Sequence, residues 1–350
     1  MKVFWLSRFA ICSLALSLVG LVTAQPPNRS YHLLKTYHFG AAEGSNREYF
    51  DYITVDSSSR RVYLSHGTEV KVIDADSGAL IGSVTGLRLV HGVALATEFG
   101  RGFISDGQQG KVIIFDLRTL KVIGEAKAAP DADCVLYDPA TKRVFSMNGD
   151  SHSSTVIDAK TGDTEGTIDL GGAPEFAVAD GKGVIYNNLE DKNQVIEIDT
   201  HSLMVKSRWP VAPTGVPTAL AIDRAHRRLF SAGRNPQMLV VMDADNGKII
   251  QSFPISAGVD AAAYDEETGL IFASTREGLV HIFHEDSPDR FSVVETVKTQ
   301  FGAKTMALDT QTHNLFLDTA DFAPPSQSAA LPKPRPEPIP GTFRVLVYGP

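Results

Sequence analysis

The residues that could bind a charged ligand recur at a nearly constant spacing along this sequence. Seven positions, separated by 41, 41, 42, 43, 42 and 44 residues, carry four carboxylates, one lysine and two uncharged residues. They are Asp51, Gly92, Asp133, Glu175, Thr218, Asp260 and Lys304, and His91 stands one residue before the second. Carboxylates held close together repel one another unless a cation compensates. If the fold brings these positions together, they form a site for a cation or an amine.

The spacing has a structural cause, because the sequence around these positions repeats. Residues 70–82 (VKVIDADSGALIG) predict two strands around a turn at 76–78. The aspartates that end the first of these strands, Asp74, Asp116, Asp158, Asp199 and Asp243, are 42, 42, 41 and 44 residues apart. A second series, which runs from Asp56 to Asp309 and closes another strand of each repeat, has the same period. Repeats of about 40–45 residues with several short strands are typical of a β-propeller. We therefore predict an all-β, seven-bladed propeller of four-stranded antiparallel blades.

The last repeat lacks a strand, and the beginning of the chain has a spare one. A proline-rich insert at 323–341 separates the second strand of this repeat from a final strand at 342–348, while residues 31–39 (YHLLKTYHF) precede the first repeat. Free sheet edges invite aggregation. We therefore predict that 31–39 pairs antiparallel with 343–348 and closes the ring. We expect the insert to be a mobile loop on the ligand-facing side, serving as a lid or a partner contact.

Residues 1–24 have the pattern of a secretory signal peptide, with Lys2 and Arg8 before an apolar run and small residues at the end. We expect 25–350 to be a single exported domain, periplasmic or extracellular, monomeric and without a membrane span. Without the two basic residues of the signal, 31 basic residues face 41 acidic ones, a net charge of −10. This charge disfavours nucleic-acid binding.

Other candidate motifs favour structural roles. DADSG at 74–78 and DADNG at 243–247 resemble the start of a calcium loop but lack its glutamate, so we expect turns. His281 and His284 are three residues apart and would lie on opposite faces of a strand. Cys134, the one cysteine left after signal cleavage, follows Asp133, which would raise the thiol pKa, so we expect a buried structural residue. No CxxC zinc motif or CxxCH haem motif occurs.

Three segments, RRVYLSHG at 60–67, KRVFSMNG at 142–149 and RRLFSAG at 227–233, resemble the YVTN repeat of YncE-like seven-bladed propellers, which are exported bacterial proteins. The following VIDADSG and VMDADNG resemble that family's next strand and turn. The resemblance implies an exported binding or scaffold protein and transfers no catalytic residues. More distantly, the repeats are similar to propeller lactonases and quinoprotein dehydrogenase subunits, which share only the architecture.

Together these observations favour a non-catalytic ligand-binding or protein-interaction propeller with a small polar ligand at the channel mouth. The predicted ligand-binding residues are Asp51, His91, Asp133, Glu175, Asp260 and Lys304, with His152 and Arg234 reaching in from loops. We expect His66, Asp106, Asn193 and Arg276 on the same face. One alternative is that these residues merely line a water-filled channel. The other is a propeller enzyme, either a lactonase-like hydrolase or a quinoprotein-type oxidoreductase subunit. The sequence identifies neither a metal nor a cofactor.

Overall fold

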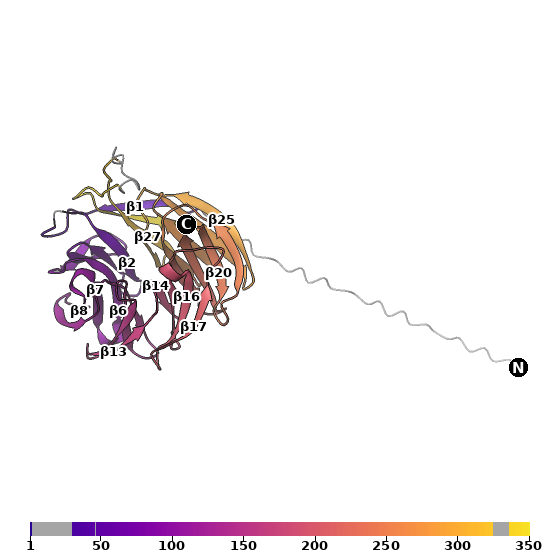
Figure 1. The fold of residues 1–350 in the computed structure, drawn as a ribbon. Helices are drawn as coiled ribbons and strands as arrows, with labels where there is room; N and C mark the ends of the chain where they lie inside the picture. The colour runs from indigo at the N-terminus through magenta and orange to yellow at the C-terminus, as the bar shows by residue number, and fades with distance from the viewer. Residues whose placement is uncertain (2–29, 46, 325–335) are drawn as a thin grey trace, which may run out of the picture.

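Seven four-stranded antiparallel sheets form the computed structural model, arranged as a ring of blades (Figure 1). The structure describes residues 1, 30–45, 47–324 and 336–350. The fold and the blade count predicted from the repeats are confirmed. The predicted signal peptide lies, apart from Met1, outside the described residues. No helix of the described part is long and apolar enough to cross a membrane.

The first four blades follow the order of the chain, each running from its innermost to its outermost strand. Blade 1 is β2 (Phe50–Asp56), β3 (Arg61–His66), β4 (Glu69–Asp74) and β5 (Leu80–Val84). Blade 2 is β6 (Val90–Ala96), β7 (Arg101–Asp106), β8 (Lys111–Asp116) and β9 (Val122–Lys127). Blade 3 is β10 (Ala132–Asp138), β11 (Arg143–Asn148), β12 (Ser153–Asp158) and β13 (Thr164–Asp169). Blade 4 is β14 (Pro174–Ala179), β15 (Val184–Leu189), β16 (Gln194–Asp199) and β17 (Met204–Pro210).

The last three blades complete the ring. Blade 5 is β18 (Pro217–Asp223), β19 (Arg228–Arg234), β20 (Gln237–Asp243) and β21 (Ile249–Pro254). Blade 6 is β22 (Val259–Asp265), β23 (Leu270–Thr275), β24 (Leu279–Ser287) and β25 (Arg290–Lys298). Blade 7 is β26 (Met306–Asp309), β27 (Asn314–Thr319), β28 (Arg344–Gly349) and β1 (His32–His38). Three 3₁₀ turns, η1 (Thr97–Phe99), η2 (Gly107–Gln109) and η3 (Glu190–Lys192), connect strands.

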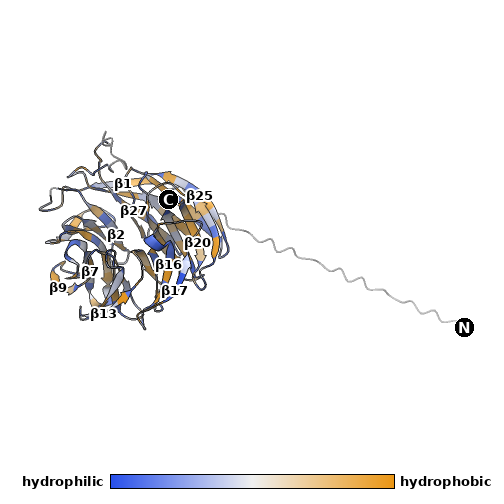
Figure 2. Cartoon of the chain, viewed as in Figure 1, coloured by the Kyte–Doolittle hydropathy of each residue, from blue (hydrophilic) through white to orange (hydrophobic). Residues whose placement is uncertain are grey.

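Burial explains the residue pattern of the strands. The second strand of a blade, such as β11, is buried along almost its whole length, because neighbouring blades cover both of its faces. The outermost strand, such as β17, alternates between exposed and half-buried residues. Figure 2 shows apolar residues along the strands of the ring. The buried apolar residues form seven clusters, and each cluster lies between two adjacent blades. Stacking of blades thus provides the core that one repeat alone would lack.

The N-terminal strand closes the ring as predicted. β1 pairs antiparallel with β28, with Leu33 opposite Tyr348 and Tyr37 opposite Val345. Just before β1, Tyr31 is buried, and its ring contacts Phe272 of blade 6 edge-on with centroids 5.2 Å apart. The outermost strand of the last blade therefore comes from the opposite end of the chain.

The described ends of the proline-rich insert are paired with each other. Phe322 forms an antiparallel bridge with Pro338, and the Ala323 N–H donates to the Glu337 carbonyl at 2.8 Å. Phe322 and Pro338 also line a hollow with Arg276 and Lys304. The ends of the insert thus lie beside the channel mouth. Residues 325–335, the centre of the expected loop, lie outside the described residues.

Candidate functional site

The inner strands begin at one end of the ring, and their first residues enclose the mouth of the channel. A cavity of about 260 Å³ there is lined by seven of the eight predicted ligand-binding residues. These are Asp51, His91, Asp133, Glu175, Arg234, Asp260 and Lys304. The structure therefore brings together one side chain from each of the seven blades, up to 253 residues apart in sequence between Asp51 and Lys304.

His91 is the centre of the acidic part of this cavity. Its Nδ1 atom lies 2.8 Å from Asp51 Oδ2 and 3.3 Å from Asp133 Oδ1. The Tyr49 hydroxyl donates to Asp51 Oδ2 at 3.0 Å and lies 3.0 Å from the same histidine nitrogen. Asp51, His91 and Asp133 each place one possible ligand atom within 4.8 Å of the others, so this group could also hold a metal ion.

Charges and burial shift the pKa values of these groups in different directions. Burial lowers the pKa of His91, but the hydrogen bond with Asp51 and the charge of Asp133 outweigh it and raise the pKa to about 9. Burial opposes ionisation of Asp51, yet Lys304 and His91 hold its pKa below the ordinary value. Burial raises the pKa of Asp133 to about 7, and nearby carboxylates add to this effect. Burial and Asp133 also raise the pKa of Glu175.

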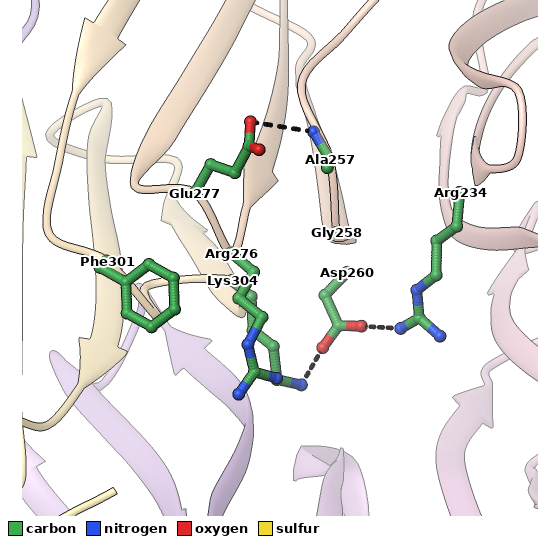
Figure 3. A pocket seen from close by; sticks show the side chains of 8 residues that line it. All are labelled: Arg234, Ala257, Gly258, Asp260, Arg276, Glu277, Phe301 and Lys304. Carbon is green, nitrogen blue, oxygen red and sulfur yellow. Dashed lines mark hydrogen bonds and ion pairs between the residues drawn. The ribbon is translucent and has the colours of Figure 1, made fainter. Parts of the chain in front are cut away.

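The other part of the mouth is basic. Asp260 forms ion pairs with Arg234 on one side and with Lys304 on the other, as Figure 3 shows. In the same view the Arg276 side chain lies next to Lys304, and the Phe301 ring stands across from Asp260. Arg276 also packs over the Phe322 ring, 5.8 Å from its centroid. Arg276 and Phe301 line a second cavity of about 260 Å³, which shares Arg234, Asp260 and Lys304 with the first.

The two cavities differ in charge. The first has five carboxylates, Asp131 included, against Arg234, Lys304 and the imidazole of His91. The second has Arg234, Arg276 and Lys304 against Asp260 and Glu277. Because the cavities share three residues, an acidic region and a basic region lie side by side at the mouth. This arrangement can accept a ligand that carries groups of both signs.

Four polar residues of the first cavity were not predicted from the sequence, namely Tyr49, Tyr52, Asp131 and Thr305. Tyr49 and Asp131 stand two residues before Asp51 and Asp133, so in an extended segment they lie on the same side. Tyr52 follows Asp51 and also reaches the cavity, where burial raises its pKa. Extending each repeat by two residues toward its N-terminal side would have found Tyr49 and Asp131.

His152 does not line the cavity. It is an exposed residue immediately before β12 with a positive φ of 52°. The reason is the turn between the second and third strands of blade 3, which puts His152 in the left-handed region with its side chain in solvent.

The other residues expected on this face lie around the mouth. His66 is buried, contacts Glu48 and stacks on Phe343 with centroids 4.1 Å apart. Asp106 is buried and accepts a hydrogen bond from the Arg88 N–H at 2.9 Å. Asn193 Oδ1 accepts from the Val216 N–H at 2.6 Å. These three residues support loops, and only Arg276 of the four reaches a cavity that contains predicted ligand-binding residues.

The motifs interpreted as structural have structural contacts. Asp74 Oδ1 accepts from the Ser77 N–H at 2.8 Å, and Gly78 has a φ of 72°, which confirms a turn at 74–78. His281 contacts Ser256, whereas His284 contacts Asp286, so the two histidines share no site. Cys134 is buried, and burial followed by the charge of Asp133 raises its thiol pKa to about 12.

Comparisons with known proteins support the fold and give a weak relationship. No protein-family model matches the chain. The Salmonella typhi "Uncharacterized protein YncE" is 27% identical over 149 residues, which are 40% of this chain and 42% of that protein. Hydrazine synthase of Kuenenia stuttgartiensis is similar in structure, with a TM-score of 0.66 over 79% of this chain and 96% of that chain. Its identity of 14% shows the fold alone. The weak homology and the seven blades support a YncE-like propeller.

Proposed function

We propose that this propeller is a non-catalytic binding scaffold whose channel mouth takes a small ligand with a cationic group and an anionic group. An α-amino acid or a short peptide has this character. The observation that carries the proposal is the division of the mouth into an acidic and a basic region that share Asp260. The acidic region would hold an amine, and the basic region would hold a carboxylate.

The acidic region has acceptors available for an amine. Arg234 and Lys304 already neutralise Asp260, whereas Glu175 forms no salt bridge within the described part of the chain. Asp133 Oδ1 is buried, and it accepts no hydrogen bond from the described residues. An ammonium group has three donors and no acceptor, so it would satisfy Asp133 and reduce its repulsion with Glu175 and Asp51.

The basic region provides the complementary charge. Arg234 and Arg276 are guanidinium groups, which match the planar geometry of a carboxylate. Lys304 adds a third positive charge beside them. The two cavities are each about 260 Å³. Their combined size suits a metabolite or a few residues of a peptide better than a large ligand.

Isothermal titration calorimetry with three ligand classes tests this proposal. The panel is a diamine, a dicarboxylate and a set of amino acids and dipeptides, titrated into the wild type and into Asp133→Asn with Glu175→Gln. We expect only the dipolar ligands to bind well, and we expect the double variant to lose at least about tenfold in affinity, equivalent to about 1.4 kcal/mol. Asp163→Asn removes an exposed carboxylate of blade 3 away from the mouth and should bind as the wild type does.

The same titrations can reject the proposal. Identical isotherms for wild type and double variant would reduce the mouth to a lined water channel. Tight binding of the diamine together with no effect of Arg276→Gln would remove the anionic half of the ligand and leave a simple cation site. If dipolar ligands bind the wild type and bind more weakly both to the Asp133→Asn, Glu175→Gln variant and to Arg276→Gln, the result supports the complete site.

A second candidate function is hydrolysis, and the pKa of Asp133 favours it. A carboxyl group with a pKa of about 7, next to the imidazole of His91, is suited to act as a general base near neutral pH. Asp133→Asn would then abolish turnover of lactones or esters while ligand binding persists. Binding without turnover in the wild type would exclude this alternative for the substrates tried.

We further propose that the protein is exported. The pattern of residues 1–24 supports export, and N-terminal sequencing of the mature protein tests it, with an expected start after Ala24.

We also propose that the proline-rich insert covers the mouth. The position of Phe322 and Pro338 beside Arg276 supports a lid or partner contact formed by the insert.

A further inference from the structure

The joint between blades 5 and 6, at the end of the ring opposite the mouth, departs from the repeat in its charges. At five of the seven joints a buried aspartate at the end of an inner strand faces the next blade. In three joints it meets a basic side chain from a turn residue with positive φ: Asp309 meets Arg60 at 2.6 Å, Asp180 meets Arg227 at 3.5 Å and Asp265 meets His313 at 2.7 Å. These carboxylates therefore have a cation supplied by the neighbouring blade.

Between blades 5 and 6 this cation is missing. The equivalent turn residue is Gly269, four positions after Asp265 just as Arg227 is four positions after Asp223. The joint between blades 3 and 4 also has a glycine there, Gly183, and Thr200 fills the gap by donating to Asp138 at 2.7 Å. A hydroxyl group thus replaces the cation in that joint.

In blade 6, Glu285 occupies the position of Thr200. The equivalence follows from the backbone, because the Thr200 N–H donates to the Gly183 carbonyl and the Glu285 N–H donates to the Gly269 carbonyl, both at 2.9 Å. A second carboxylate therefore faces Asp223, where other joints have a cation or a hydroxyl. Two carboxylates so close repel each other unless a positive charge lies between them.

One side chain of the joint is positioned to bridge the two carboxylates. His226 Nδ1 lies 2.8 Å from Asp223 Oδ2 and 3.0 Å from Glu285 Oε1. A single N–H can be donated fully to one of them, and Glu285 Oε1 is left without a hydrogen-bond donor although its side chain is only 3% exposed. The other oxygen of Glu285 accepts from the Tyr264 hydroxyl at 2.8 Å. Among the described residues, His226 is the one basic side chain within ion-pair distance of either carboxylate.

We propose that Asp223, His226 and Glu285 bind a divalent transition-metal ion such as Zn²⁺, which replaces the cation missing from this joint. The three ligand atoms lie within 4.8 Å of one another. An ion about 2.1 Å from each ligand in a facial arrangement would hold the ligand atoms about 3 Å apart, close to the 2.8 Å and 3.0 Å that separate His226 Nδ1 from the two carboxylate oxygens. One nitrogen and two carboxylate oxygens suit zinc or a similar ion, whereas calcium and magnesium prefer oxygen ligands alone. His226 is half-exposed, so water would complete the coordination.

The site is separate from the channel mouth. Asp223 ends β18, and the mouth lies at the opposite end of the inner strands, roughly 20 Å away for a seven-residue strand. The function of the ion would be to join blades 5 and 6, because Asp223 and His226 belong to one blade and Glu285 to the next. Binding to the folded ring alone would raise the melting temperature.

Zn²⁺ and Co²⁺ titrations of the full chain, after treatment with a chelator, test this site. All proteins carry Asp133→Asn and Glu175→Gln, so that binding at the mouth is weakened. We expect one equivalent of ion, a visible Co²⁺ absorption band and a higher melting temperature. Glu285→Thr copies the joint between blades 3 and 4 and should weaken binding at least 100-fold. Gly269→Arg copies the joint between blades 4 and 5 and should displace the ion while the protein stays folded.

His313→Gln is the matched control, because it removes a histidine that pairs with an inner-strand aspartate in a joint without a second buried carboxylate. It should bind the ion as its parent does. Equal ion binding by the Glu285→Thr protein and its parent would show an adventitious ion only and would overturn the proposal. Absence of any binding to the parent would also overturn it and would leave His226 alone as the bridge between the two carboxylates.

Discussion

Two aspartates on strand β10 show how differently the two ends of the ring are built. Asp138 closes the strand and is fully buried, where it accepts hydrogen bonds from Thr141 and, across the joint, from Thr200. Asp133 begins the same strand at the mouth, with a raised pKa and an oxygen that no described residue satisfies. One carboxylate is thus used completely by the fold, and the other is left available to a ligand.

The same contrast holds around the ring. Five of the seven inner strands end in a buried aspartate or are directly followed by one, namely Asp138, Asp180, Asp223, Asp265 and Asp309. At the mouth the equivalent positions vary from carboxylate to glycine, threonine and lysine. The end that joins the blades repeats because every joint has the same structural task. The mouth end varies because its residues face an open space and not a repeated neighbour.

The largest expected effect comes from opening the ring, because both ends of the ring depend on its closure. Deletion of residues 25–40 removes β1 and exposes the edge of β28. It also removes buried Tyr31. We expect a loss of at least ~3 kcal/mol in the free energy of unfolding, at ~25 cal/mol per Å² of apolar area, together with self-association. Chemical denaturation and analytical ultracentrifugation measure both. A monomeric deletion variant with unchanged stability would contradict the role of β1.

The next effect distinguishes the two ends directly. Asp138→Ala leaves the donors of Thr141 and Thr200 without their acceptor inside the joint. We expect it to reduce the free energy of unfolding by about 2 kcal/mol. Asp133→Asn on the same strand should cause no loss. Equal destabilisation by both substitutions in urea denaturation would show that the mouth end is also structural.

The mouth pair should have a smaller effect that depends on pH. The pKa of Asp133 is raised to about 7 in the folded protein, well above its ordinary value, so its contribution to stability is lost as the pH rises from about 4 to about 7. Asp133→Asn with Glu175→Gln removes this loss. We expect the stability of the double variant relative to the wild type to increase by at least about 1 kcal/mol between pH 4 and pH 7 and to level off at higher pH. A difference that does not change between about pH 4 and pH 7 would show that neither group is perturbed by the fold.

Excision of residues 325–335 should have the smallest effect on stability. The ends of the insert are already paired through Phe322 and Pro338, so a short linker can replace the excised part. We expect a change in melting temperature below about 2 °C. A lower affinity for the ligand in the calorimetric titrations would support a lid or partner contact, and unchanged affinity would contradict it.

The residues at the mouth could be predicted from the sequence because the repeat carries positional information. Once seven units were aligned, equivalent positions had to converge on one axis, and Asp51, Asp133, Glu175, Asp260 and Lys304 do so. The prediction that His152 reaches the cavity was wrong, because its left-handed backbone conformation in the turn before β12 leaves its side chain in solvent. Tyr49 and Asp131 were missed because they precede the strand that defined the alignment.

The sequence by itself determined the number of blades, the closure by residues 31–39 and the end of each strand at which the charges lie. These properties follow from periodicity and strand order, which are local or additive along the chain. Only the tertiary structure decided which charges neutralise one another. Asp260 between Arg234 and Lys304, and Glu285 facing Asp223, depend on side chains from different blades. The reason is that electrostatic pairing varies with distance and burial, and neither is encoded in a repeat length.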